Sequence, residues 1–388
     1  MESGGAPARQ PAAATSSVSR IGAACTTIAV ALIVYFLVVM ARFYHPGTGF
    51  TALIGFPAGH DYEVPALRGV PHYDYSGIGV YDGQFYAQLA LDPLLKNPQT
   101  DHAMDLAPFR ARRILFSWTA YVAGLGRPAW ILEAYALQNV AAWLLLAWLL
   151  ARWMPPSTPR GLAAWGACLF SHGLLWSVRF SLLDGPSLVL TVLAVRCAED
   201  GRAFLAAALA GVNGLGRETN VIGGLAQPLP RSAADALRLI AMAIVVVLPL
   251  LVWEDYLYSI YRSNIWLGVD AQASRFGAEF AAGLLQAVRG RSLFDVCILG
   301  SLFVQAGYVV TQVRRGGEAW WRVAAGYVLL LLVLDKVLVS PSTGAITRVT
   351  LPLTVGFNVL LGREAKGGRF WPWLVAGNLH LVPAAWIL

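Results

Sequence analysis

The chain has 388 residues, of which 57% are apolar and only 13% are charged, and its formal net charge is +7 at pH 7. An ordinary soluble domain carries about twice that share of charged residues, so the composition excludes this class and indicates a polytopic membrane protein. The basic residues are spread through short connecting segments and form no run or patch, which argues against nucleic acid as a partner.

The N-terminal part of the chain consists of a polar segment, an apolar run and a long loop. Residues 1–20 are rich in Ala, Ser, Pro and Gly and predict a disordered cytoplasmic tail. The run 21–40 is too long for a signal-peptide core and predicts an uncleaved transmembrane helix. The loop 43–127 follows, and its apolar part at 113–125 is too short to cross a bilayer. We therefore expect a shallow or re-entrant helix there.

Apolar runs alternate with short loops through the rest of the chain, and we expect one domain over 21–388. Together with the first helix, the later runs predict an all-α protein with about eleven transmembrane helices. These runs cover residues 130–151, 161–178, 185–198, 202–216, 219–230, 237–256, 292–312, 321–340, 345–361 and 370–388. The four cysteines lie in or beside apolar runs without the spacing of a metal or redox site, which predicts free, buried thiols at Cys25, Cys168, Cys197 and Cys297.

The distribution of Lys and Arg predicts the orientation. If the N-terminus is cytoplasmic, the short loops on that side contain fourteen Lys or Arg residues, whereas the short loops opposite contain four. A difference of this size fits the positive-inside rule. The long loop 43–127 is therefore predicted to be extracytoplasmic, together with the acidic and basic residues at the outer ends of the later helices.

Asp82 begins a short segment, 82–92, in which apolar and polar residues separate onto two faces. This spacing predicts an amphipathic helix at the membrane interface, with Asp82 as its N-cap. The helix dipole favours a charged carboxylate at such a position. An ionised carboxylate at the water–lipid boundary is able to accept a proton from a hydroxyl group during group transfer. The residues alone leave two interpretations open, a catalytic base and a plain helix cap.

Other charged residues fall at predicted outer helix ends, and each also has two interpretations. Asp184 is either a second carboxylate of a site or the cap of a helix with an early proline. Arg217 and Glu218 either bracket a phosphate and a sugar hydroxyl, which suits the fork of an arginine, or form local ion pairs.

Three neighbouring arginines and an intramembrane charge complete the set. Arg112 and Arg113, with Arg110 before them, either bind a phosphate or lie at the interface as snorkelling side chains. Lys336, beside Asp335 within an apolar run, is expected to face a cavity or a partner, because a charge at that depth is costly. Lys336 then either reaches a lipid phosphate or belongs to an internal pair.

Several of these segments, in order along the chain, resemble the GT-C superfamily of membrane glycosyltransferases, which take sugars from polyprenyl-phosphate carriers. The GPI-anchor mannosyltransferases and bacterial cell-surface glycopolymer relatives are the most similar. The segments are YDG at 81–83, RRILFSWTAYVAGLG at 112–126, LLARWMPPSTPR at 149–160, FSLLDGPSLVL at 180–190 and GLGRETN at 214–220. The similarity covers roughly residues 21–230 and is thinner afterwards, where TRVTLPL at 347–353 is similar.

The resemblance implies transfer of a sugar from a polyprenyl-phosphate-linked donor to a lipid, glycan or polymer acceptor at the outer face of a bacterial inner membrane. Asp82 matches the essential aspartate of the first outer loop, and Asp184 matches an acidic residue of the following outer turn. We expect the donor phosphate and sugar to be bound by Arg112, Arg113, Arg217, Glu218, Lys336 and Arg348. The rival functions are a transporter or flippase of lipid-linked saccharides and a non-catalytic subunit of cell-surface polymer assembly.

No cofactor is predicted, because the sequence contains no nucleotide-binding loop and the donor is already activated on its lipid. A divalent metal is the alternative, since four histidines share the long loop with several aspartates. None of them has the spacing of a known ligand set. The histidines are His45, His60, His72 and His102.

Overall fold

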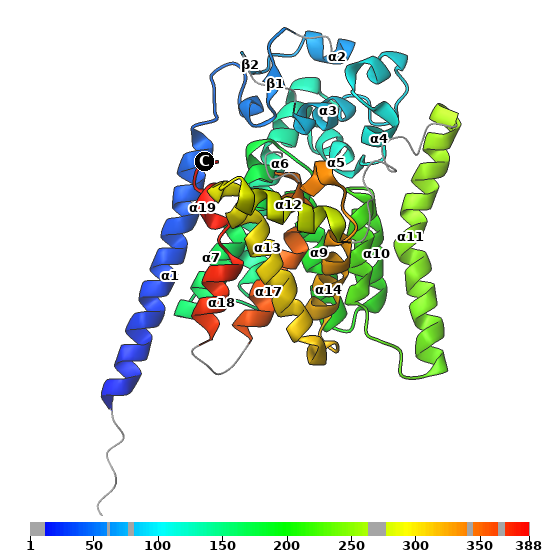
Figure 1. The fold of residues 1–388 in the computed structure, drawn as a ribbon. Coiled ribbons are helices and arrows are strands. Elements are labelled where there is room, and N and C mark those ends of the chain that lie inside the picture. Colours follow the sequence, from blue (N-terminus) through cyan, green and yellow to red (C-terminus); the bar gives the residue numbers. More distant parts are fainter. Residues whose placement is uncertain are drawn as a thin grey trace, which may run out of the picture.

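The computed structural model describes residues 12–59, 63–76, 81–262, 277–339, 344–363 and 369–387. Helices dominate this part of the chain (Figure 1). Its one sheet is a parallel pair of two-residue strands, β1 (Phe56–Pro57) and β2 (Asp74–Tyr75). The protein is therefore predominantly α-helical, as its composition predicts.

Four helices in the described residues are long and apolar enough to cross a membrane. A pair of shorter helices, bent by 44° at a two-residue break, makes a fifth crossing if it is counted as one span. The four are α1 (Ala12–Ala41), α6 (Pro128–Leu150), α11 (Ala233–Tyr261) and α13 (Leu293–Thr311), and the bent pair is α7 (Pro159–Leu169) with α8 (His172–Arg179). These helices indicate a membrane-embedded protein, but eleven crossings are not confirmed.

Several runs predicted as single crossings are broken into shorter helices. The run 345–361 breaks at Thr350, and Pro352, which has no amide donor, occupies the first turn of the next helix. The run 321–340 breaks before Lys336, and 370–388 breaks after Gly377. The resulting helices are α14 (Ala319–Leu331), α15 (Lys336–Val339), α16 (Ala345–Val349), α17 (Leu351–Gly362), α18 (Phe370–Gly377) and α19 (Leu381–Ala384).

The segment 219–230, predicted to cross, is instead a 3-10 segment, η3 (Glu218–Ala226). At ~2.0 Å per residue it extends much less than the ~30 Å of a hydrocarbon core. It packs against α9 (Asp184–Glu199), α10 (Ala203–Gly214) and α14. The prediction of a crossing there is wrong, because an apolar composition does not distinguish a buried connecting segment from a span.

The N-terminal helix α1 begins at Ala12, so the prediction of a disordered tail over all of 1–20 is wrong for residues 12–20. Residues 1–11 lie outside the described part of the chain. The Ala and Ser residues of this segment are compatible with a helix, and the apolar run that follows extends it.

The long loop forms a cap over one end of the helix bundle, blue to cyan in Figure 1. Glu133 of α6 anchors it, because both carboxylate oxygens accept from the amide of Phe50, at 3.1 and 2.9 Å. Besides the two strands, the cap contains η1 (Thr51–Leu53), α2 (Pro65–Arg68), α3 (Asp82–Leu89), η2 (Pro98–Ala103), α4 (Ala107–Ala111) and α5 (Leu115–Ala123).

Helix α3 is buried on all sides, so the predicted two-faced interfacial helix is wrong. Gln84 and Gln88 are two of the polar residues in the pattern at 82–92, and both are fully covered by neighbouring residues. Gln88 is satisfied inside the cap, where its Oε1 accepts from the amide of Val64 at 2.8 Å. A buried glutamine with a local partner has the same sequence pattern as an exposed one.

Ion pairs join the connecting loops at the end of the bundle opposite the cap. Arg152 and Asp200 are 2.6 Å apart, and Arg363 contacts Glu199 at 3.0 Å and Glu318 at 2.8 Å. These residues belong to four of the basic loops that the charge count assigned to one side of the membrane. The acidic and basic residues beside the cap form a separate group.

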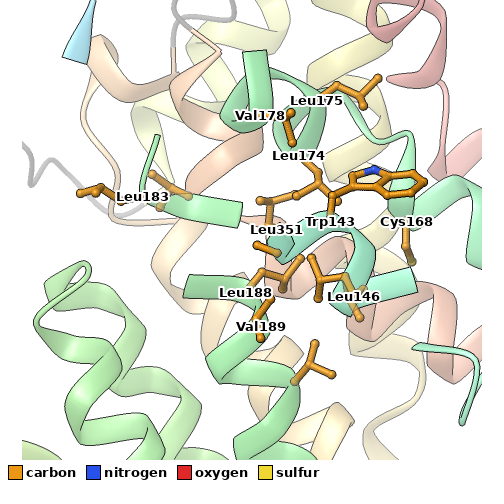
Figure 2. Close-up of a cluster of buried hydrophobic side chains, with 14 of the residues drawn as sticks. Trp143, Leu146, Cys168, Leu174, Leu175, Val178, Leu183, Leu188, Val189 and Leu351 are labelled. Atoms are coloured by element: carbon orange, nitrogen blue, oxygen red, sulfur yellow. The ribbon is translucent and has the colours of Figure 1, made fainter. Parts of the chain in front are cut away.

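Apolar packing positions the helix ends that carry these residues. Figure 2 shows a buried cluster that includes Trp143 of α6 and residues of α7, α8, α9 and α17. The indole of Trp143 donates to the carbonyl of Leu169 at 2.8 Å, at the break between α7 and α8. Leu183, directly before Asp184, and Leu351, three residues after Arg348, are part of the same cluster. Close van der Waals packing stabilises contacts between helices in a bilayer, so this core holds both charges in place.

Candidate functional site: an arginine and carboxylate cluster beside Asp82

Ten charged side chains meet where the cap contacts the bundle, and we call them the charge cluster. They come from segments far apart in the sequence: the cap, α9, η3, α11 and α16. The arginines are Arg110, Arg112, Arg113, Arg217 and Arg348, and the carboxylates are Asp82, Asp105, Asp184, Glu218 and Glu254. Nearly all the predicted site residues are therefore brought together.

Asp82 is the first residue of α3, and Tyr81 before it is the N-cap residue. The prediction that Asp82 is the N-cap is thus wrong by one position, although the carboxylate still lies in the first turn, where the helix dipole favours its charge. Its side chain is 31% exposed, and its Oδ1 is 3.0 Å from Nη2 of Arg110. Burial opposes ionisation of this carboxyl, but Arg110, Arg348 and Arg113 outweigh it and hold the pKa of Asp82 below its usual range.

Arg110 connects Asp82 to the rest of the cap. Its Nε and Nη2 donate to the two carboxylate oxygens of Asp105 at 2.9 and 2.7 Å, and its Nη1 donates to the hydroxyl of Tyr86 at 3.4 Å. The same hydroxyl accepts from Nη1 of Arg113 at 3.4 Å. Because Arg110 makes its two-point contact with Asp105, it holds Asp82 through a single oxygen.

Arg113 and Arg112 tie the cap to the bundle. Nε of Arg113 lies 3.1 Å from Oε2 of Glu218 on η3, and its guanidinium is 4.2 Å from the ring centroid of Phe109. Arg112 is almost fully buried, and its Nε is 2.6 Å from Oε1 of Glu254 on α11. Arg112 thus anchors a candidate spanning helix, whereas Arg113 shares the hydroxyl of Tyr86 with Arg110.

Asp184 lies between two buried arginines at the start of α9. Its Oδ1 is 3.0 Å from Nη2 of Arg217, and its Oδ2 is 3.1 Å from Nη1 of Arg348. Both oxygens are occupied, and the side chain is only 3% exposed. Asp184 therefore fixes the positions of two arginines relative to each other. The guanidinium of Arg348 also lies 5.8 Å from the ring centroid of Tyr81, next to Asp82.

Buried polar atoms without partners lie around these charges. Nε of Arg217 has no hydrogen-bond acceptor among the described residues, and the hydroxyl of Tyr135 on α6 has no partner there either. Tyr135 lies within electrostatic range of both Asp82 and Asp184. Such groups are costly to bury unless a ligand or water satisfies them.

The described residues do not show Lys336 or the histidines of the long loop as part of a site. Lys336 begins α15, but its ammonium group lies outside the described part of the structure. Among the loop histidines, His72 contacts Asp74 at 3.1 Å, and His60 lies outside the described residues. No three His, Cys, Asp or Glu side chains converge in a metal-binding arrangement in the described ranges.

Two members of the charge cluster, Glu254 and Asp105, were absent from the predicted site, and so was Tyr86, which bonds to two of its arginines. Glu254 had a sequence signal, because a carboxylate within an apolar run normally has a buried partner. Tyr86 had none, since its ring belongs to the apolar pattern and only its hydroxyl bridges Arg110 and Arg113.

Gly83, next to Asp82, lies against the backbone of another element, so we expect Gly83→Ala to displace the start of α3. An added Cβ would be 2.1 Å from the carbonyl oxygen of Phe180 and 3.0 Å from that of Ile54. Overpacking of this kind costs about 1–3 kcal/mol, which thermal unfolding in detergent would measure. Gly69→Ala is the control, because nothing lies within 4 Å of a Cβ at that position. Equal stability of both variants would show that α3 is not held by this contact.

Comparisons with known proteins return no match: no family model, no curated protein and no solved structure is similar to this chain.

Proposed function

We propose that the protein is a membrane glycosyltransferase that moves a sugar from a polyprenyl-phosphate-linked donor to an extracytoplasmic lipid, glycan or polymer acceptor. The observation that carries the proposal is the position of Asp82, an ionised and partly exposed carboxylate beside buried arginines. Such a site offers a base for a hydroxyl group and fixed positive charge for a phosphate within one cluster.

In the proposed reaction, the acceptor hydroxyl attacks the anomeric carbon of the donor sugar. A new carbon–oxygen bond forms there while the bond to the phosphate oxygen breaks, and the hydroxyl proton moves to Asp82. The polyprenyl phosphate leaves with the electron pair of the broken bond. A single displacement inverts the configuration at the anomeric carbon, and no cofactor is needed.

We assign the leaving phosphate to Arg217, Arg348 and Arg113. Arg217 has an unpartnered Nε, and all three guanidinium groups are buried, where fixed charge acts strongly on a developing anion. Arg112 is assigned an anchoring role because Glu254 holds it 2.6 Å away. Asp184 is a positioning residue that orients Arg217 and Arg348.

The direct test is sugar transfer by the purified protein in liposomes that contain an undecaprenyl-phosphate-linked radiolabelled sugar and membrane-extracted acceptors. Appearance of label on an acceptor, with release of undecaprenyl phosphate, is the expected result. Movement of the intact lipid-linked sugar between leaflets without transfer would favour the transporter alternative and overturn the proposal.

Arg217→Gln is expected to weaken donor binding more than acceptor binding. One lost charge-assisted hydrogen bond is worth about 1.5–3 kcal/mol, or roughly a 10- to 150-fold rise in the donor Kd. The donor Kd is measured by equilibrium binding of undecaprenyl-phosphate sugar to the protein in detergent. Arg127→Gln, an exposed arginine at the start of α6, is the control. An unchanged donor Kd in Arg217→Gln would leave this arginine with a structural role alone.

The proposed location of the site outside the cytoplasm predicts which surface cysteines react in intact cells. Gln99 of the cap and Ser157 of the α6–α7 loop are both exposed, whereas the four native cysteines are buried. Gln99→Cys should react with an impermeant thiol reagent in intact cells, and Ser157→Cys only after permeabilisation. The reverse pattern would place Asp82 on the cytoplasmic side and exclude the proposed acceptor.

A further inference from the structure

A cavity of about 500 Å³ lies at the end of the bundle opposite the charge cluster. It is bordered by the turn between α9 and α10, the segment after η3, the first turns of α11 and the α13–α14 connection. Its polar lining includes Arg231, Arg238, Arg322 and Asp235, and its apolar lining includes Leu229, Leu239 and Met242.

Positive charge predominates in this cavity. Arg322 donates from Nε, Nη1 and Nη2 to the carbonyls of Leu225, Gly316, Gly317 and Ala226, at 2.6–3.0 Å, and no carboxylate pairs with it in the described ranges. These four bonds occupy most of its N–H donors, but its charge is not neutralised. Asp235 is the one acidic residue of the lining, and one of its carboxylate oxygens accepts from the amide of Arg231 at 3.3 Å.

Arg231 and Arg238 supply the charge that is available to a ligand. Both are exposed, and neither forms an ion pair within the described part of the chain. They flank the N-terminus of α11, where the helix dipole adds attraction for an anion.

The surroundings of the cavity are apolar and face outward. Leu229 is 63% exposed, and Phe204 of α10 and Leu237 of α11 are 66% and 69% exposed. The cavity is lined by the first turns of α11, a candidate membrane span that begins at Ala233, so we expect it at the bilayer surface. An anionic group held there would have an apolar surface directly beside it.

We propose that this cavity binds the headgroup of an anionic phospholipid. The phosphate would lie between Arg231 and Arg238, and Arg322 would add long-range attraction. The acyl chains would follow the exposed apolar surface of α10 and α11. Basic pockets between spanning helices bind anionic headgroups on this principle, and the site is independent of the sugar-transfer proposal.

The test compares lipid binding by wild type and by Arg231→Gln/Arg238→Gln, using native mass spectrometry of protein supplied with equal amounts of phosphatidylglycerol and phosphatidylcholine. Wild type should retain phosphatidylglycerol preferentially. At ~1 kcal/mol per arginine, the double variant should bind it about 30-fold more weakly. Arg289→Gln/Arg291→Gln removes two exposed arginines before α13, at the other end of the bundle, and should bind like wild type.

Two further measurements make the result decisive. Thermal unfolding without added lipid should be the same for both double variants, which separates lost binding from lost folding. Excess inorganic phosphate should not displace phosphatidylglycerol from wild type. Equal retention by all three proteins, or displacement by inorganic phosphate, would overturn the assignment of a phospholipid site.

Discussion

Asp82→Asn is expected to reduce sugar transfer by ~10²–10⁴-fold, the usual contribution of a general base. Asparagine keeps the size of the side chain and an oxygen for Arg110, but it cannot accept the acceptor's proton. Because Arg110 also has its two-point contact with Asp105, the cap should remain folded. Donor binding and thermal stability should therefore stay near wild type while the rate falls.

Transfer in liposomes, measured at saturating donor, gives the rate, and Asp101→Asn is the control. Asp101 is an exposed carboxylate of the same cap that accepts from the hydroxyl of Tyr261. Since the pKa of Asp82 is lowered, the base stays deprotonated throughout the neutral range. The ion pair of Asp82 with Arg110 stabilises the fold fully above the pKa of an unfolded aspartate, about 3.9. This stabilisation is lost as the pH falls through the lower pKa of Asp82 in the folded protein. Near-normal transfer by Asp82→Asn would remove the basis of the proposed mechanism.

Asp184→Asn is expected to destabilise the protein by about 3–5 kcal/mol, because it leaves Arg217 and Arg348 buried without a counter-ion. The free energy of unfolding in detergent, from denaturant titration, measures the loss. Asp200→Asn is the control, since Asp200 pairs with Arg152 on the surface and such pairs contribute only about 0–1 kcal/mol.

The two roles of Asp184 predict different results. A positioning residue loses stability and activity together. If Asp184→Asn is as stable as wild type but no longer transfers sugar, Asp184 acts in the reaction itself, as the sequence resemblance suggests. The positioning role assigned from its two arginine contacts would then be wrong.

The long helices were predictable from sequence, because a sustained apolar run has few alternatives in a membrane. The runs 130–151 and 292–312 correspond closely to α6 (Pro128–Leu150) and α13 (Leu293–Thr311). The breaks within these apolar runs were not predictable, because the composition stays apolar through them. The run 345–361 is interrupted at Thr350, and the next helix begins at Leu351 with Pro352 in its first turn.

Most of the charged residues in the cluster were predictable from the sequence, but which of them form ion pairs with one another was not. A charged residue at the end of a predicted helix is easy to identify, because the run beside it is apolar. Its partner depends on how distant segments pack, as with Arg113 and Glu218, which are 105 positions apart. The burial of Gln84 was also not predictable from the sequence, since the same pattern of polar and apolar residues suits an exposed helix face.

The separation of Asp184 and Arg348 along the chain has a consequence for biogenesis. They are 164 positions apart, and at ~5–20 residues per second the ribosome needs roughly 8–30 s to add that length. Arg217 is added early in this interval, and until Arg348 follows, it is the only one of the two arginines that Asp184 can contact. Completion of this cluster therefore waits until α16 has been synthesised. A chain that stops before α16 would carry Asp82 but not the completed arginine pair behind it.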